Sequence, residues 1–420
     1  MQQNGFVALD RKDYTRKTFF CGTHRAISPQ ETVNRLRHFL PVMGITRVAN
    51  VTGLDYIGIP VVMVTRPNSR CLSVSQGKGL TLDAAIASGI MESIEAYHAE
   101  SIQNPLKLNS YEELCYTHKM VDISALPSLS DSRFERHLRL LWVEGHDLMT
   151  GESVWIPYEM VSLDFTNSTL GSGRCFPASS NGLASGNCLF EAISHGICEV
   201  VERDSSSLWF MHTVEYNQRN RLDMSTVDDP ACREVIASFD EADIFLAVWE
   251  TTSDIGIPSF ICVIMDRGDN PFRLMFPTSG MGCHPSREVA LLRALTEAAQ
   301  SRLTFIAGSR DDVLRRSYDS NRNRDILQRY RTIMMHDHGY PLRDFRSIVT
   351  WNSDTFEDDI NWMLKGLMGS GIKSVIVVNL SRREFDIPVV RIIVPGLEEL
   401  HTVPGYVPGH RARAAMEECQ

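Results

Sequence analysis

The sequence GLTLDAAIASGIMESIE, residues 79–95, is the first of three copies of one pattern in this chain. The second copy is GNCLFEAISHGICEVVE, residues 186–202, and the third and weaker copy is HPSREVALLRALTEAAQ, residues 284–300. Each copy has an alanine at its seventh position and ends in two oxygen-bearing side chains three residues apart. Side chains three or four residues apart lie on the same face of a helix. Each copy therefore predicts a helix that presents two such groups to one point.

The three predicted helices carry polar side chains on matching faces. The final pairs are Glu92 and Glu95, Glu199 and Glu202, and Glu297 and Gln300. Four positions before the first member of each pair lie Ser88, His195 and Arg293. Three helices that direct five carboxylates, an amide and an arginine inward would bury charge, which is very costly without partners. Divalent cations are natural partners because they bind carboxylate oxygens. The alternative is a set of solvated helix faces paired with Arg203 and Arg302, but the matched register of three copies favours a site.

Glycine-containing turns precede the first two copies. SQGKG, residues 75–79, places Lys78 between two glycines, with Thr81 as the expected helix N-cap. SSNGLASGN, residues 179–187, contains Asn181 and Ala184. Glycine lets backbone N–H groups approach a ligand, and a helix N-terminus favours an anion. The first turn is not a Walker A motif, because the upstream glycine and the Ser or Thr after the lysine are missing. With the carboxylates, these turns predict a nucleotide held with Mg²⁺ between the helices, whereas a tight turn without a ligand is the alternative.

Bulk properties narrow the functional class. Hydrophobic residues make up 43% and charged residues 22% of the 420 residues, as in an ordinary globular protein. The net charge of −10 argues against nucleic acid or an anionic membrane as the main partner. No apolar run is long enough to cross a membrane, and the N-terminal residues lack the apolar region of a signal peptide. The ten cysteines include no Cys-x-x-Cys pair, so we expect a cytoplasmic protein with free thiols.

Apolar, β-branched runs between the copies predict strands at residues 60–65, 260–265, 374–379 and 389–394. Helices at residues 82–99, 187–205 and 286–306 alternate with these strands, so we expect a mixed α/β or α+β fold. We expect residues 1–60 to form an N-terminal extension packed on a domain of residues 61–420. A di-iron helix bundle is a second metal-binding alternative. Such bundles use two Glu-x-x-His motifs, however, and the copies provide only Glu95 with His98.

Three segments of the chain resemble the ATP-binding motifs of the YcaO-domain family. They are SQGKGLTLDAAIASGIMESIEAYHAE at residues 75–100, SNGLASGNCLFEAISHGICEVVERDS at residues 180–205 and EVALLRALTEAAQSR at residues 288–302. RIIVPGLEE, residues 391–399, is similar to the C-terminal core of that family. The resemblance implies a YcaO-like fold in which three acidic helices surround Mg-ATP. It also implies an enzyme that phosphorylates the oxygen of a peptide-bond amide after a nucleophile has added to the carbonyl carbon.

The motif match implies a role for each matching side chain and names ATP and Mg²⁺ as cofactors. The residues implied to hold metal are Glu92, Glu95, Glu199, Glu202 and Glu297. The residues implied to bind ATP are Lys78, Ser88, Asn181, Ala184, Arg203, Arg293 and Gln300.

The nucleophile separates the branches of this family. In azoline formation it is a Cys, Ser or Thr side chain of the substrate peptide, and in thioamide formation it is external sulfide. Azoline-forming members commonly end in Pro-x-Pro-x-Pro, whereas this chain ends in AAMEECQ. GTHRAISPQETVNRLRHFLPVMGITRVANVTGLDYIGIPVVMVTRPNSR, residues 22–70, and VPGYVPGHRAR, residues 403–413, resemble the TfuA-associated branch. That branch is linked to thioamidation, with TfuA helping to deliver sulfur. We therefore expect a thioamide-forming enzyme that acts on a peptide or protein with a TfuA-like partner.

Several alternatives stay open at this point. The chain is either the expected enzyme, an azoline-forming cyclodehydratase, or a nucleotide-binding scaffold, and the intact acidic residues in all three copies disfavour the scaffold. The resemblance also implies a homodimer to which the N-terminal extension contributes, with a monomer as the alternative. If sulfide is external, Cys188 and Cys198 on the second predicted helix need not react, and their apolar neighbours indicate burial. The competing view makes one of them a persulfide carrier.

Overall fold

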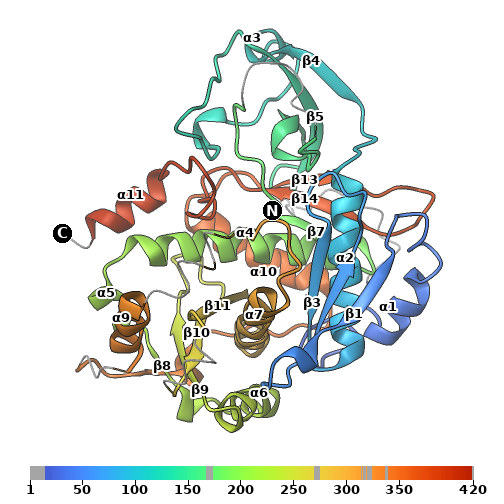
Figure 1. The fold of residues 1–420 in the computed structure, drawn as a ribbon. Coiled ribbons are helices and arrows are strands. Elements are labelled where there is room, and N and C mark those ends of the chain that lie inside the picture. The colour runs from blue at the N-terminus through green and yellow to red at the C-terminus, as the bar shows by residue number, and fades with distance from the viewer. Residues whose placement is uncertain are drawn as a thin grey trace.

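The computed structural model describes residues 15–166, 174–268, 275–313, 315, 318, 324–335 and 339–418. Within these residues helices and strands alternate along the chain in a mixed α/β arrangement, which confirms the predicted fold class. The described strands form three antiparallel sheets and one short parallel pair. Figure 1 shows an upper lobe that follows α2 in the chain and a larger body below it. The body holds all three copies of the acidic pattern.

The first and third acidic helices each pack on a three-stranded sheet and follow its last strand. The first unit comprises β1 (Arg47–Asn50), β2 (Val61–Thr65), β3 (Val74–Lys78) and α2 (Leu82–Ala99). The third unit comprises β9 (Ile244–Glu250), β10 (Ser259–Asp266), β11 (Thr278–Cys283) and α7 (Arg287–Ala307). In both units the strands pair in chain order, so a strand leads straight into the acidic helix. The repeated sequence pattern is thus a repeated strand–turn–helix unit.

The second acidic helix, α4 (Leu189–Met211), follows an edge strand of the largest sheet. The strands of this sheet are β4 (Leu106–Ser110), β5 (Arg139–Asp147), β6 (Ser153–Pro157), β7 (Leu183–Ser185), β13 (Ile376–Asn379) and β14 (Val389–Ile393). Their order is β4-β5-β13-β14-β7, with β6 paired to β5. β4 and β5 belong to the upper lobe, whereas β13, β14 and β7 lie at the top of the body (Figure 1). This sheet therefore connects the lobe to the acidic helices.

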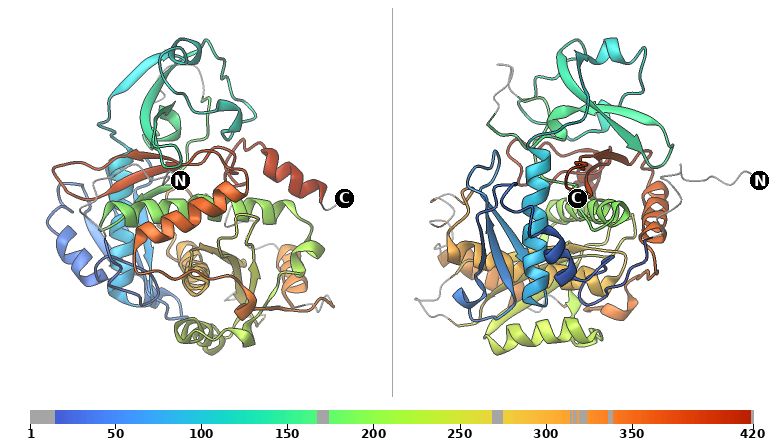
Figure 2. Two further views of the ribbon diagram at one scale, coloured as in Figure 1. Left: turned by 180° about the vertical axis from the view of Figure 1, so that it is seen from behind. Right: turned by 90° about the vertical axis from the view of Figure 1, so that its right-hand side faces the viewer.

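The remaining elements surround this arrangement. They are α1 (Pro29–Leu36), α3 (Tyr111–Leu114), α5 (Val214–Gln218), α6 (Pro230–Glu241), α9 (Arg324–Met335), α10 (Phe356–Gly369), α11 (His410–Glu417) and the parallel pair β8 (Leu222–Asp223) and β12 (Arg343–Asp344). α1 packs against α2, α6 against α7, and α10 and α11 against α4. Seen from behind, α10 runs alongside α4 (Figure 2). Each acidic helix is therefore enclosed between its own sheet and an outer helix.

Small residues at one repeat position bring each helix onto its strand. A Cβ atom on Gly77 of β3 would lie 2.0 Å from the carbonyl oxygen of Ala85. A Cβ atom on Gly282 of β11 would lie 2.1 Å from the carbonyl oxygen of Ala290. Ala184 occupies the same repeat position in β7. Glycine in a strand is typical of such a close backbone approach. The first glycine-containing turn therefore serves helix packing, a role that the sequence analysis did not assign to it.

The three acidic helices also begin in the same way. Their N-cap residues are Thr81, Cys188 and Ser286, and each side chain accepts a hydrogen bond from the backbone N–H three residues later. Such caps satisfy one of the free N–H groups in the first turn. The predicted N-cap role of Thr81 is confirmed. Because each helix begins at the same repeat position, the acidic residues that follow reach equivalent places.

Residues 15–28, which precede α1, fold back on themselves at an isolated antiparallel bridge between Phe19 and Arg25. The backbone N–H of Lys17 donates to the carbonyl of Asp354 at 2.9 Å, and the N–H of Ala26 donates to Glu191 at 3.0 Å. β1 pairs with β2 across the predicted boundary at residue 60. The part of residues 1–60 that is described thus contributes a strand to the first sheet, and the division into domains stays a prediction. A separate finding is that no helix in the described ranges is long and apolar enough to span a membrane.

Candidate functional site

A cavity of about 850 Å³ lies where the three acidic helices meet. With the exception of Asn181 and Ala184, every residue that the sequence analysis assigned to metal or ATP lines this cavity. These lining residues are Lys78, Ser88, Glu92, Glu95, Glu199, Glu202, Arg203, Arg293, Glu297 and Gln300. His195, which shares its repeat position with Ser88 and Arg293, lines the cavity as well. The structure therefore brings the three predicted helix faces to one place.

The first glutamate of two copies is held by its own sheet. Glu92 Oε1 accepts a hydrogen bond from the backbone N–H of Gln76 in β3 at 3.4 Å. Glu297 Oε1 accepts one from the backbone N–H of Met281 in β11 at 3.3 Å. In both units the donor precedes the acceptor by 16 residues. The geometry of strand and helix is thus repeated along with the sequence spacing.

The second glutamate contacts the sheet of the next unit instead. Glu95 of α2 accepts hydrogen bonds from the backbone N–H and the hydroxyl of Ser185 in β7, at 2.8 and 2.6 Å. Glu202 of α4 accepts one from the backbone N–H of Cys283 in β11 at 3.0 Å. Ser185 and Cys283 occupy the same repeat position. Each unit therefore holds the last carboxylate of the unit before it in the chain.

The third unit closes this arrangement onto the first. Gln300 of α7 donates from Nε2 to the side-chain oxygen of Gln76 in β3 at 3.4 Å. Thr304 donates to the same oxygen at 2.7 Å. A carboxylate has no hydrogen to donate to that oxygen, whereas an amide does. This contact explains why the third copy ends in glutamine, and it completes a carboxylate ring made of Glu92, Glu95, Glu199, Glu202 and Glu297 around the cavity.

Basic side chains approach the carboxylate ring from several elements. Lys78 Nζ lies 2.5 Å from Glu297 Oε2, and Arg203 Nη1 lies 3.4 Å from Glu202 Oε1. Arg293 lines the same cavity. These cations come from β3, α4 and α7, so they surround the cavity along with the carboxylates. Such a mixture of partly buried charges suits a polyanionic ligand that arrives with cations of its own.

The ionisation of the carboxylate ring indicates a shortage of positive charge. Burial raises the pKa of Glu92, raises that of Glu199 to about 7, and raises that of Glu95 well above its usual range. Burial also acts to raise the pKa of Glu297, but nearby cations, Lys78 foremost, outweigh it and lower that pKa. The basic residues thus compensate only part of the ring. Buried oxygen donors that lack cations fit Mg²⁺, which binds carboxylates and keeps positions for phosphate oxygens and water.

Asn181 and Ala184 lie outside the cavity lining. Ala184 is the middle residue of β7, and its neighbours Leu183 and Ser185 both line the cavity. Because side chains alternate along a strand, Ala184 points the other way, into the apolar core beneath α4. Asn181 lies in the turn before β7, and its side-chain oxygen is buried without a hydrogen-bond partner among the described residues. We leave both residues out of the proposed site.

Residues 21–25 of the N-terminal segment also line the cavity, and the sequence analysis did not select them. Arg25 Nη1 lies 4.0 Å from Glu191 of α4, whose other carboxylate oxygen accepts the N–H of Ala26. These contacts join parts of the chain about 165 residues apart. No spacing rule relates such positions. The available signal was that GTHR, residues 22–25, belongs to a segment that resembles one branch of the YcaO family.

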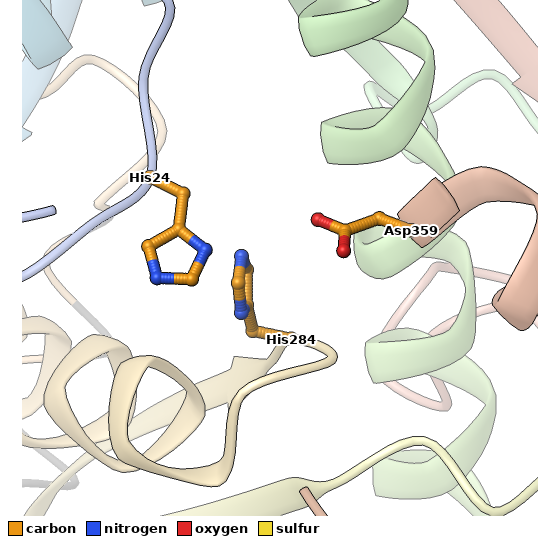
Figure 3. A group of neighbouring side chains, drawn as sticks. All are labelled: His24, His284 and Asp359. Atoms are coloured by element: carbon orange, nitrogen blue, oxygen red, sulfur yellow. The ribbon is translucent and has the colours of Figure 1, made fainter. Parts of the chain in front are cut away.

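A second polar group borders the cavity. His24 and His284 line it, and Asp359 of α10 lies next to them, with one side-chain nitrogen or oxygen of each within 4.8 Å of the others. Figure 3 shows the two rings and the carboxylate turned toward one another. Asp359 forms an ion pair with Lys17 at 2.6 Å. His284 directly follows Cys283 in the chain, and the N–H of Cys283 donates to Glu202 of the carboxylate ring. The group of His24, His284 and Asp359 therefore adjoins the ring.

Comparison with known proteins identifies a family. Residues 76–398 match the family described as YcaO cyclodehydratase, ATP- and Mg²⁺-binding. An uncharacterized protein in the tfuA 3′ region of Rhizobium leguminosarum bv. trifolii is 36% identical over 380 residues, which cover 89% of this chain and 88% of that protein. An uncharacterized protein of Methanothermobacter thermautotrophicus is 32% identical over 399 residues, which cover 93% of this chain and 99% of that protein.

Solved structures share the fold described above. YcaO from Methanopyrus kandleri, bound with AMPPCP and Mg²⁺, has a TM-score of 0.72 at 25% identity, and the match covers 94% of this chain and 98% of that one. A heterocyclase in complex with substrate and cofactor has a TM-score of 0.76 at 22% identity. That match covers 92% of this chain but only 54% of the heterocyclase chain, and it bears on the fold alone.

Proposed function

Because the chain belongs to the YcaO family of ATP- and Mg²⁺-binding proteins, we propose that it is an ATP-dependent enzyme that converts a peptide backbone amide into a thioamide. The observation that carries the proposal is the carboxylate ring, closed by three strand–helix units around one cavity. Partly buried carboxylates whose pKa values are raised by desolvation favour bound cations, and Mg-ATP brings them. The placement of the ring in three different units also explains why the pattern occurs three times.

The cavity residues divide by charge. The residues that would hold Mg²⁺ are Glu92, Glu95, Glu199, Glu202 and Glu297. When bound, Mg²⁺ would supply positive charge beside the phosphates. Lys78, Arg203 and Arg293 would contact phosphate oxygens, and Ser88 and Gln300 would donate hydrogen bonds to them. Charges fixed by the fold stabilise phosphoryl transfer well, since they need not reorganise during the reaction.

The proposed reaction balances with hydrosulfide as the nucleophile. The sulfur adds to the carbonyl carbon of the amide, and the resulting oxyanion attacks the γ-phosphorus of ATP, so that ADP leaves. The C–O bond then breaks with phosphate as the leaving group, and the S–H proton is lost as the C=S bond forms. The protein must align three reactants for this sequence and limit access of water, which would otherwise compete for the phosphoryl group.

The choice of thioamide over azoline is supported by gene context and sequence. The relative that is 36% identical over most of both chains comes from the tfuA 3′ region of its genome. We take this as support for a TfuA-like protein as the partner that delivers sulfur. The resemblance of residues 22–70 and 403–413 to the TfuA-associated branch also favours thioamide formation.

A second candidate function is an ATP-dependent azoline-forming cyclodehydratase. The family description, which names a cyclodehydratase, favours it. In that reaction a Cys, Ser or Thr side chain of the substrate replaces hydrosulfide, and the same carboxylate ring would serve ATP. A non-catalytic nucleotide-binding scaffold is less favoured, since each of the five positions of the carboxylate ring carries a glutamate.

Mass spectrometry of co-expressed peptides tests these functions. The chain is produced with a TfuA-like protein and candidate peptides, and the peptides are weighed intact. A gain of about 16 Da marks exchange of oxygen for sulfur, and a loss of about 18 Da marks cyclodehydration, which follows from the nucleophile used. Omission of the TfuA-like protein is the matched control for sulfur delivery. Unchanged masses for all peptides, with Mg-ATP binding intact, would refute an amide-activating enzyme in favour of the scaffold.

A further inference from the structure

The proposed reaction needs a base that the carboxylate ring does not provide. One proton must leave the substrate, either from S–H as the thioamide forms or from the attacking side chain in azoline formation. The carboxylates of the ring are assigned to Mg²⁺. Three histidines line the cavity, namely His24, His195 and His284. Arg293 Nη1 donates to His195 Nδ1 at 3.4 Å, so neutral His195 carries its hydrogen on Nε2 and has no free lone pair, which leaves His24 and His284 as candidates.

His284 has a fixed role as a hydrogen-bond donor. Its Nδ1 accepts a hydrogen bond from the backbone N–H of Ser286 at 3.0 Å. A neutral imidazole then carries its hydrogen on the other nitrogen, Nε2. Burial lowers the pKa of His284 well below its usual range, so the neutral form is present at neutral pH. With one nitrogen accepting and the other protonated, His284 has no free lone pair for a proton or a metal ion.

Lys17 makes the group of His24, His284 and Asp359 unsuitable for a metal ion. The ammonium lies 2.6 Å from Asp359 Oδ2, and the two side chains are 0% and 1% exposed. It also donates to the backbone carbonyl and hydroxyl of Ser353 at 3.0 and 3.2 Å. Lys17 therefore already neutralises the carboxylate. A dication at this place would meet a buried ammonium at short range, which is strongly unfavourable in a low-dielectric site.

His24 has a free ring nitrogen on each side of this arrangement. Its Nδ1 is buried without a hydrogen-bond partner among the described residues. Figure 3 shows one nitrogen of the ring turned toward His284 and Asp359. A carboxylate oxygen of Asp359 lies within 4.8 Å of a His24 nitrogen, a separation that one water or a small ring rotation can bridge. With Nδ1–H directed to that carboxylate, the Nε2 lone pair is left free to take a proton, as in catalytic His–Asp pairs.

The charges around His24 keep it neutral. Burial, and after it the nearby Lys17, lowers the pKa of His24 to about 4. The other titratable groups against it are Asp359 on α10, His284 after β11, and Arg25 next to it in the chain. Of these four groups, Lys17 and Arg25 are cationic and favour the uncharged ring, whereas the charge of Asp359 is paired with Lys17. The unprotonated imidazole is therefore present throughout the neutral pH range.

We propose that His24 is the general base of the amide-activating reaction, with Asp359 and His284 as positioning residues. This inference rests on the proposed function. Nε2 takes the S–H proton as the C=S bond forms and phosphate departs, while Asp359 orients the ring through Nδ1–H. The proton then passes to water through the open cavity, which restores the neutral ring. In azoline formation the same nitrogen takes the proton of the attacking Cys, Ser or Thr side chain.

The first test compares His24→Gln with the wild type on a peptide that the wild type modifies. Gln keeps polarity and size but cannot take a proton, so we expect product formation to fall roughly 10²–10⁴-fold. Mg-AMPPCP affinity should be unchanged, and added imidazole should restore part of the rate. His137→Ala, which alters an exposed side chain of the upper lobe, is the control and should react normally. A wild-type rate for His24→Gln, or a loss that imidazole does not reverse, would overturn the inference.

A second test needs no peptide. Diethyl pyrocarbonate acylates unprotonated imidazole nitrogens, and peptide mapping locates the modified histidines. We expect modification of His24, whose pKa burial lowers to about 4, to continue at pH 5, at which an ordinary imidazole with a pKa of about 6.5 is mostly protonated and reacts slowly. If diethyl pyrocarbonate leaves His24 unmodified, the inference is overturned. It is also overturned if a metal ion co-purifies with the wild type and is lost from the variant His284→Ala. If the wild type modifies no peptide, the proposed function fails and takes this inference with it.

Discussion

Replacing Glu202 by Gln removes one negative charge from the carboxylate ring at nearly constant size. Glu202 is 2% exposed, its Oε2 accepts the N–H of Cys283 at 3.0 Å, and its Oε1 lies 3.4 Å from Arg203 Nη1. An amide has one oxygen and one NH₂ group. If the oxygen faces Cys283, the NH₂ group faces the guanidinium of Arg203, and two donors then oppose each other. The substitution therefore keeps the link between α4 and β11 through a neutral oxygen but removes the charge that faces Arg203.

The effect on catalysis should far exceed the effect on stability. Loss of one preorganised electrostatic group from an active site costs roughly 10²–10³ in turnover, or about 2.7–4 kcal/mol. The free energy of unfolding should change by less than about 1 kcal/mol. The reason is that burial, and in addition the charge of Glu202, raises the pKa of Glu199, so the neighbouring carboxylates repel each other without cations. Relief of that repulsion offsets the lost contacts.

Three measurements test this reasoning: ATP hydrolysis with the peptide substrate, calorimetric binding of Mg-AMPPCP, and thermal unfolding. Glu241→Gln, which alters an exposed carboxylate at the end of α6, is the control and should match the wild type. Glu92→Gln should behave like Glu202→Gln, since it removes another charge from the ring. Wild-type rates of ATP hydrolysis for both ring variants would refute the assignment of the carboxylate ring to Mg-ATP.

Three further predictions concern pH, packing and sulfur. Burial raises the pKa of Glu199 to about 7, so a bound cation must displace a proton below that pH. The affinity for Mg-AMPPCP should therefore fall as the pH drops through 7. Calorimetry in buffers of different ionisation heat should detect the released protons, and Glu199→Gln should reduce their number. Gly77→Ala should destabilise the protein by about 1–3 kcal/mol, because the new Cβ would lie 2.0 Å from the carbonyl oxygen of Ala85. Urea unfolding measures the change in stability, and an unchanged midpoint would contradict the packing role of Gly77. The variants Cys188→Ala and Cys198→Ala should form thioamide from inorganic sulfide and Mg-ATP at near-normal rates. The reason is that Cys188 caps α4 and Cys198 is buried against Met363. Loss of activity in either folded variant would mean that sulfur passes through this protein.

Local spacing determined a large part of the site. The i, i+3 and i, i+4 rule places Ser88, Glu92 and Glu95 on one face of α2, and those side chains do line the cavity. The N-cap at Thr81 was predicted for the same reason, because capping involves residues only three apart. Such signals are readable in the sequence because a helix has a fixed period. The mixed α/β class followed from apolar runs between the helices.

The glycines mark the limit of that reading. A Gly-Lys-Gly turn favours a phosphate as well as a tight backbone contact, and the sequence analysis chose the ligand. The structure places Gly77 against the backbone of α2, and at the matching position Ala184 points into the core. Strand alternation separates Ala184 from the cavity by a single residue step. The exact strand boundaries, which sequence patterns leave uncertain by a few residues, decide which neighbour faces the ligand.

The sequence by itself determined the three acidic helices, their common face and the kind of ligand that such faces require. Only the tertiary structure decided that the helices form a closed ring, in which Glu95 is held by Ser185, 90 residues away, and Glu202 by Cys283, 81 residues away. It also decided that His24 meets Asp359 at the edge of the cavity. Periodicity encodes contacts within one helix, because its geometry is fixed by local hydrogen bonds. Contacts between units depend on how whole sheets pack, and no short spacing in the chain records that packing.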